Sequence, residues 1–134
     1  MNILFICKYN RFRSKIAESV FNKLNKNKNH KAKSAGIIKG SYPLDKNQVK
    51  EAKRQQILLK GHPQGITTDL LRWQEMIIIV ANDVPSLLFK ENLKYNKKVA
   101  VWSISDAKTD NKKEIAGIIK KIKQKITKLT EEIT

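Results

Sequence analysis

The feature of this 134-residue chain that most restricts its fold is the run MIIIVA at residues 76–81. Six consecutive apolar residues make a segment of strand length that has no polar side. A strand of this kind is covered on both faces, as it is in a parallel sheet between two layers of helices. The run therefore predicts a parallel α/β sheet with residues 76–81 near its centre.

Segments with strand character alternate along the chain with segments whose apolar residues have helical spacing. We expect strands at residues 2–7, 31–34, 76–81 and 98–103, and helices at residues 14–24, 46–56, 67–71, 85–89 and 111–133. This alternation is typical of a sheet with helices on both faces. The predicted fold is α/β, a three-layer sandwich in a single domain over residues 1–134, with a four-stranded parallel sheet in the order 2-1-3-4.

Three of the expected helices have candidate N-terminal caps, because Ser, Asp and Asn side chains accept hydrogen bonds from the first free N–H groups of a helix. Ser14 and Asp45 are the expected caps of the first two helices, and Asn111 with Glu114 fits a capping box. The last helix has one apolar stripe opposite its lysines, made of Ile115, Ile118, Ile119, Ile122, Ile126, Leu129 and Ile133. We expect this stripe to cover the sheet.

The composition is that of a globular protein, with 40% hydrophobic and 30% charged residues. No apolar run approaches the ~20 residues of a membrane span, and positive charges follow the apolar start instead of preceding it, so we expect a cytoplasmic protein without a membrane partner. The net charge of +16 attracts anions of many kinds. The lysines are scattered, so solvated faces explain them as well as nucleic acid does, and a nucleic-acid partner stays open.

The segment CKYNRFRS at residues 7–14 joins the first strand to the first helix. It therefore lies at the carboxyl edge of the sheet, where open α/β sheets bind their ligands. Inward-facing backbone N–H groups and the positive end of the helix dipole favour a tetrahedral oxyanion at such a loop. The expected phosphate-binding residues are Lys8, Tyr9, Asn10, Arg11, Phe12, Arg13 and Ser14.

Cys7 and Arg13 are the candidate catalytic residues of this loop. Arg13 can place two N–H donors on two phosphate oxygens, and the same positive surroundings stabilise a nucleophilic Cys7 thiolate. A lone cysteine ending a buried strand is usually a small hydrophobic residue, but its position between strand and helix favours the nucleophile. As the only cysteine, Cys7 excludes an internal disulfide or a thiolate metal cluster.

The segment NILFICKYNRFRSKIAE resembles the opening of the low-molecular-weight protein tyrosine phosphatase family, with its C-x-x-N-x-x-R-S loop. The resemblance continues in the S-A-G element at residues 34–36 and in MIIIVA followed by Asn82-Asp83. It implies a cysteine-dependent phosphatase in which Ser34 and His62 hold Asn10 and Ser14 lies near the Cys7 sulfur. Tyr9 replaces the family's usual glycine. Because glycine adopts a positive φ more freely than tyrosine does, we expect a different shape at the rim of the loop.

Other departures from the family pattern affect the rim of the loop, where Lys8, Arg11 and Lys15 replace apolar, small or proline residues. The extra positive charge favours a more anionic substrate. Tyr9 and Tyr42 are the candidates for the aromatic walls that the family places beside the loop.

The resemblance also implies a general acid after the fourth strand, where Asp106 stands with Ala107 in place of the usual proline. The fourth strand should deliver Asp106 to the same sheet edge as Cys7. Asp110 is the competing candidate, but its place at the start of the last helix is better explained by N-capping.

The predicted reaction is hydrolysis of a phosphate monoester, with phosphotyrosine implied by the resemblance alone, through a phosphocysteine on Cys7. The expected substrate is a phosphorylated protein or a small phosphate monoester. Inorganic phosphate is the product, and no metal or cofactor is expected. Two alternatives stay open: an arsenate reductase-like enzyme that uses an external thiol, and a non-catalytic module that binds phosphate or nucleic acid.

We predict that Cys7 is alkylated rapidly by iodoacetate at mildly acidic pH and that phosphate or vanadate protects it. The reason is that an anion-binding loop stabilises the thiolate and places it beneath the bound oxyanion. The measurement is the alkylation rate by mass spectrometry, with and without phosphate. A rate equal to that of an ordinary thiol and indifferent to phosphate would contradict the prediction.

Overall fold

The computed structural model describes residues 1–40 and 43–133. The predicted contribution of Tyr42 to an aromatic wall therefore lies outside the described residues. In the part that is described, no helix is long and apolar enough to cross a membrane.

Four parallel strands form the sheet, in the order β2-β1-β3-β4. They are β1 (Asn2–Cys7), β2 (Lys31–Gly36), β3 (Met76–Val80) and β4 (Lys98–Trp102). The predicted fold class and strand order are confirmed, and the MIIIVA run lies in the interior of the sheet between β1 and β4. The register places Cys7 beside Gly36 and Ile6 beside Ile79, so the strands end at one common edge.

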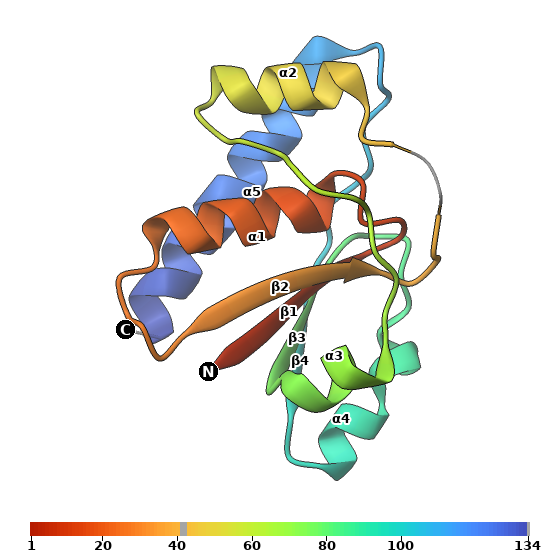
Figure 1. Ribbon diagram of the computed structural model, residues 1–134, viewed down its shortest axis with the longest axis vertical. Helices are drawn as coiled ribbons and strands as arrows, with labels where there is room; N and C mark the ends of the chain where they lie inside the picture. The colour runs from red at the N-terminus through yellow and green to blue at the C-terminus, as the bar shows by residue number, and fades with distance from the viewer. Residues whose placement is uncertain (41–42, 134) are drawn as a thin grey trace.

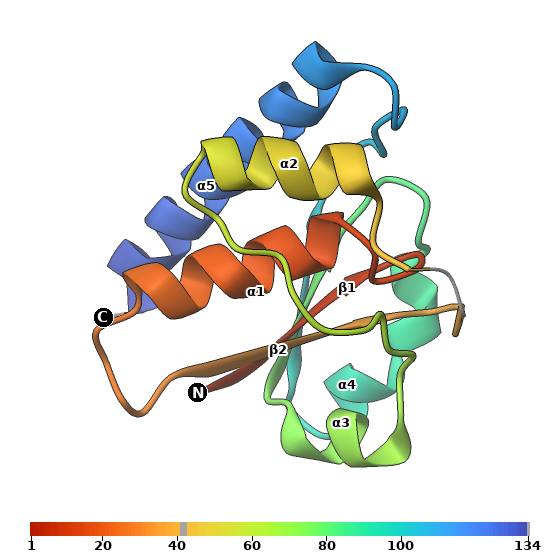
Figure 2. The same cartoon turned by 45° about the horizontal axis from the view of Figure 1, so that its top comes forward.

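Helices cover both faces of the sheet (Figures 1 and 2). One layer holds α1 (Arg13–Leu24), α2 (Lys46–Arg54) and α5 (Lys112–Ile133), and the other holds α3 (Thr68–Trp73) and α4 (Glu91–Lys94) after a 3-10 turn, Ser86–Phe89. The sheet separates two apolar clusters, one under each layer. The short helix α4 was not expected from the sequence, and the 3-10 turn at Ser86–Phe89 (η1) takes the place of the helix predicted at 85–89.

The stripe of α5 forms much of the larger cluster, as predicted from its spacing. Its buried members are Ile115, Ile118, Ile119, Ile122, Ile126 and Leu129, and they pack with residues of α1 and the sheet. The lysines of this helix face away from the cluster. The amphipathic pattern of α5 is thus explained by its cover of the sheet.

The prediction that Ser14 caps the first helix is wrong. Helix α1 begins at Arg13, its N-cap position is Phe12 without a side-chain cap, and Ser14 is inside the first turn. The Ser14 hydroxyl is instead bonded to groups of the Cys7 loop. The N-cap lies two residues earlier than expected, so Ser14 is within the first turn and its hydroxyl is bonded to the loop instead of to its own helix's N–H groups.

The other two caps agree better with the sequence. Asp45 accepts a hydrogen bond from the Gln48 N–H, at 2.9 Å, as expected. Asn111 accepts from the Glu114 N–H at 3.1 Å, but Glu114 accepts from Lys108 and does not close the capping box on Asn111. The cap of α5 is therefore Asn111, and the N-cap role expected for Asp110 belongs to its neighbour.

We predict that Ile119→Ala lowers the free energy of unfolding by about 2–5 kcal/mol, because it leaves a cavity in a fully buried part of the core. Leu58→Ala is the control, since Leu58 is 64% exposed and its truncation should cost little. Urea unfolding followed by circular dichroism measures both. Equal effects of the two substitutions would show that α5 does not form the core described here.

Candidate active site

The loop between β1 and α1 surrounds a small hollow of about 70 Å³ at the carboxyl edge of the sheet. Residues from three parts of the chain line it: Cys7, Tyr9, Arg11, Phe12 and Arg13 from the loop, Gln48 from α2, and Asp106, Ala107 and Thr109 from the segment after β4. The structure thus brings Cys7, Arg13 and Asp106 together. The hollow has the size of a small tetrahedral anion.

A glycine and an asparagine allow the loop to make its tight turn. A Cβ atom at Gly36 would lie 2.7 Å from the Tyr9 carbonyl carbon and 2.8 Å from the Asn10 nitrogen, so only glycine admits the loop against β2. Asn10 has a φ of 57°, in the left-handed region that asparagine tolerates better than most residues. Among the described residues Tyr9 is not one of those with positive φ, so the loop does not need the family's glycine there.

A chain of hydrogen bonds fixes the Cys7 sulfur. Its Sγ lies 3.0 Å from the Ser14 Oγ, and the Asn10 Nδ2 donates to that same Oγ at 2.8 Å. Because the Ser14 oxygen accepts from the amide, its hydroxyl proton can point to the sulfur. The Cys7 sulfur is thus in direct contact with a hydroxyl that the Asn10 amide holds in place.

The Asn10 amide is itself held by partners on every polar atom. Its Nδ2 donates also to the Ser34 Oγ at 2.9 Å, and its Oδ1 accepts from the Gln64 N–H at 2.9 Å. The Ser34 hydroxyl in turn donates to the Glu18 carboxylate at 2.7 Å. Since the carboxylate accepts only, it sets the direction of each following bond up to Cys7.

The hydrogen bond to the Asn10 side chain that was expected from His62 comes from another residue. His62 is exposed, and within the described residues no hydrogen bond joins it to Asn10. The backbone N–H of Gln64, two positions further along the same loop, holds the Asn10 oxygen. Every residue except proline carries such a donor, so no side-chain signal in the sequence could have identified it.

The Arg13 side chain is 2% exposed. It is anchored by one group from the loop after β3 and one from the loop after β4. Its Nη1 donates to the Ile104 carbonyl at 2.9 Å, and its Nη2 lies 3.0 Å from a carboxylate oxygen of Asp83. Sequence reasoning gave Asp83 no role. Its position in the turn that follows β3, at the same sheet edge as the loop, was the available signal.

Asp106 lies beside Arg13, with its Oδ1 3.9 Å from the Arg13 Nε and its side chain 51% exposed. The Ala107 N–H donates to the same Oδ1 at 2.9 Å and orients the carboxyl group. Asp110 lines a different hollow, together with Lys108, Asn111 and two further lysines. The geometry therefore places only Asp106 of this pair at the Cys7 hollow.

Two basic residues of the loop have their side chains engaged elsewhere. Arg11 donates from Nε and Nη2 to the Pro43 carbonyl, at 3.0 and 2.8 Å, and so ties the loop to the segment before α2. The Lys8 Nζ lies 5.3 Å from the centroid of the Tyr9 ring. Lys8 is thus at the rim and is not among the residues lining the hollow.

The metal-ligating residue types do not gather anywhere in residues 1–40 or 43–133, where no group of three or more His, Cys, Asp or Glu could hold an ion. The residues that line the hollow instead include a thiol, the buried Arg13 guanidinium and a carboxyl group. A thiol under an arginine in a strand–loop–helix anion site defines the class of cysteine-dependent phosphatases.

The family comparison agrees with this class. The model of the low molecular weight phosphotyrosine protein phosphatase family matches residues 2–134, and the chain belongs to that family. No curated protein sequence matches the chain.

Solved structures show the same fold over nearly the whole chain. A low molecular weight protein tyrosine phosphatase from T. tengcongensis is 21% identical, with a TM-score of 0.85 and coverage of 98% of this chain and 99% of that one. A YwlE arginine phosphatase, a cysteine-to-serine mutant with a phosphorylated active-site serine, is 16% identical, with a TM-score of 0.85 and coverage of 99% and 95%. An arsenate reductase from Archaeoglobus fulgidus is 24% identical, with a TM-score of 0.73 and coverage of 96% and 98%.

We predict that Ser34→Ala lowers the free energy of unfolding by about 1–3 kcal/mol, because it leaves a buried Asn10 N–H without an acceptor. It should also weaken phosphate protection of Cys7, since Asn10 loses one of its supports. Ser19→Ala is the matched control, because the Ser19 hydroxyl makes only a 3.4 Å contact at the surface. Urea unfolding and phosphate-dependent alkylation test both variants, and equal behaviour would remove Ser34 from the support of the loop.

Proposed function

We propose that this chain hydrolyses a phosphate monoester through a phosphocysteine formed on Cys7, with Asp106 as general acid. The observation that carries the proposal is the shared hollow of Cys7, Arg13 and Asp106, with the Ser14 hydroxyl 3.0 Å from the sulfur. A nucleophile, an anion clamp and a proton donor are the three groups that such a reaction needs.

In the first step the Cys7 thiolate attacks phosphorus. The S–P bond forms, the bond from phosphorus to the ester oxygen breaks, and the protonated Asp106 gives its proton to the departing oxygen. Arg13 uses one N–H for Ile104 and one for Asp83, which leaves three of its five donors for the equatorial phosphoryl oxygens. Its anchors hold the guanidinium in place before substrate binds.

In the second step water hydrolyses the phosphocysteine. Asp106, now ionised, takes a proton from the water as the O–P bond forms and the S–P bond breaks, and inorganic phosphate leaves. The exposed half of the Asp106 side chain gives this water access. The phosphorylated active-site serine named for the YwlE mutant supports a covalent phosphoenzyme on this fold.

The substrate class follows from the family and from the hollow. A space of about 70 Å³ takes a phosphoryl group and excludes the rest of the substrate, which must contact the rim formed by Tyr9 and Lys8. We propose a phosphorylated protein or a small aryl phosphate, with phosphotyrosine as the first ester to test. The arsenate reductase alternative requires an external thiol, because Cys7 is the only cysteine.

The phosphate- or nucleic-acid-binding alternative is tested by two variants. Cys7→Ser should abolish hydrolysis of an aryl phosphate and leave phosphate binding measurable. Arg13→Ala should abolish phosphate binding. A salt-sensitive affinity for nucleic acid that survives Arg13→Ala, in a chain without phosphatase turnover, would favour the binding module.

We predict that Asp106→Asn slows hydrolysis of aryl phosphates with poor leaving groups by about 10²–10⁴-fold and of those with good leaving groups far less. The reason is that only a basic departing oxygen needs protonation. Pre-steady-state release of a graded series of phenols isolates the chemical step, because hydrolysis of the phosphoenzyme can otherwise mask it.

Asp110→Asn is the matched control for this experiment, since Asp110 lies outside the Cys7 hollow. It should leave the dependence on leaving group unchanged. A steepened dependence in Asp110→Asn, with none in Asp106→Asn, would move the acid to Asp110.

A further inference from the structure

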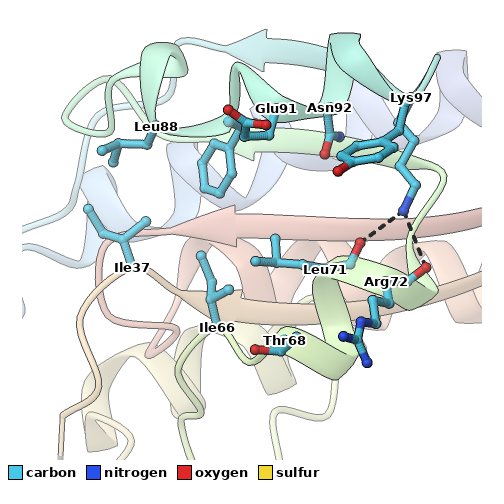
Figure 3. A pocket seen from close by; sticks show the side chains of 11 residues that line it. Ile37, Ile66, Thr68, Leu71, Arg72, Leu88, Glu91, Asn92 and Lys97 are labelled. Carbon is cyan, nitrogen blue, oxygen red and sulfur yellow. Dashed lines mark hydrogen bonds between the residues drawn. The ribbon is translucent and has the colours of Figure 1, made fainter.

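A second and much larger pocket lies on the other face of the sheet, under α3 and α4 (Figure 3). Its volume is about 750 Å³, within the range of small-molecule sites, and it shares no residue with the Cys7 hollow. Most of its wall is apolar and is formed by Ile37, Ile66, Leu71, Leu88, Phe89 and Tyr95. Leu88 and Tyr95 are exposed, so a ligand there would remove apolar surface from water.

Positive groups stand at one end of this pocket. The Lys97 Nζ donates to the carbonyls of Leu71 and Arg72, at 3.0 and 3.2 Å, and so links the turn before β4 to the end of α3 (Figure 3). An ammonium has three donors, so one remains. The Arg72 guanidinium has no hydrogen bond or ion pair with any described residue.

The one acidic residue of the wall does not cancel these charges. The Glu91 carboxylate lies 4.0 Å from the Lys94 ammonium on α4, whereas Arg72 belongs to α3 across the pocket and the Lys97 ammonium is bonded to the end of α3 (Figure 3). The net charge of +16 adds a long-range attraction for anions. A ligand that matches both the wall and the charges has an apolar body and one anionic head.

We propose that this pocket binds an amphipathic carboxylate, with its hydrocarbon body against Ile37, Ile66 and Leu88 and its carboxylate at Arg72 and Lys97. The head would take a charge-assisted pair of N–H donors from the guanidinium. The apolar body would supply most of the affinity, because the wall is mostly hydrocarbon.

The same pocket is connected to the Cys7 loop by backbone hydrogen bonds. The Ile37 N–H donates to the Cys7 carbonyl at 3.1 Å, and the Ile66 N–H donates to the Gly36 carbonyl at 3.1 Å. Gln64, whose N–H holds Asn10, is two residues before Ile66. A ligand that shifts Ile37 or Ile66 would move backbone groups bonded to the loop and to its neighbour Gly36, and we extend the proposal to an effector role for this site. This extension rests on the proposed phosphate site, whereas the binding of the carboxylate does not.

Calorimetric titration with decanoate, in saturating phosphate to block the Cys7 loop, tests the binding. Decanoate should bind at one site, and octanoate should bind more weakly by about fourfold for each methylene removed. Decanol should bind more weakly than decanoate. No binding, or equal affinity for decanol and decanoate, would overturn the site as an anion pocket.

Two pairs of variants locate the site. Arg72→Glu should weaken the binding of decanoate about tenfold or more. Lys53→Glu makes the same charge change on α2, across the sheet, and should leave decanoate binding unchanged. Leu88→Lys should weaken binding through the apolar wall, whereas Leu87→Lys, an exposed neighbour outside the pocket, should not. Equal effects within either pair would overturn the assignment to this pocket.

The effector role is tested by phosphate protection of Cys7 in the presence of decanoate. Saturating decanoate should change the phosphate concentration that gives half-maximal protection of Cys7 by about fivefold or more. Saturating phosphate should change the dissociation constant for decanoate by the same factor. An unchanged midpoint would overturn the coupling. A chain that binds decanoate and phosphate but hydrolyses no ester would overturn the proposed function and leave this site standing.

Discussion

The active-site loop depends on the buried amide of Asn10. Its three hydrogen bonds, to Ser14, Ser34 and the Gln64 backbone, all lie between 2.8 and 2.9 Å. A buried polar group without partners costs more than its bonds contribute, so a complete set of partners allows essentially one orientation. That orientation accompanies the positive φ of Asn10 and holds the Ser14 hydroxyl 3.0 Å from the Cys7 sulfur, so the shape of the loop fixes the surroundings of the thiol.

Charge at this sheet edge is arranged in advance of any ligand. The Arg13 guanidinium is buried, and a buried charge needs partners, which the Asp83 carboxylate and the Ile104 carbonyl supply. Asp106 is held further away, at 3.9 Å, and remains half in solvent. The Asp83 carboxylate is therefore paired closely with the arginine, whereas the Asp106 carboxyl group is held only loosely beside it. The proposed phosphoryl transfer would use this arrangement, with the fixed guanidinium as the clamp and the less restrained carboxyl group as the acid.

The two faces of the sheet are covered unequally, and this decides where binding surfaces can form. The long amphipathic α5 seals one face together with α1 and α2, and its stripe is buried along its length. On the other face α3 has six residues and α4 has four, too few to cover the sheet. The apolar pocket between them, with Arg72 and Lys97 at its end, follows from that short cover. Ile37 and Ile66 connect this face to the catalytic edge through the backbone.

The sequence by itself determined the parts that depend on local spacing: the four strands, the stripe of α5, and a loop that puts Cys7 and Arg13 between a strand and a helix. It also pointed to Ser34 and Asp106 through the family's pattern. The tertiary structure alone decided which group completes each hydrogen bond. Gln64 holds Asn10 in place of His62 because any residue except proline offers a backbone N–H, and Ser14 is not the cap because the N-cap of α1 lies two residues earlier. Such bonds in the site join residues up to 91 positions apart, as between Arg13 and Ile104, and their geometry is set by sheet register and helix packing, which no local spacing encodes.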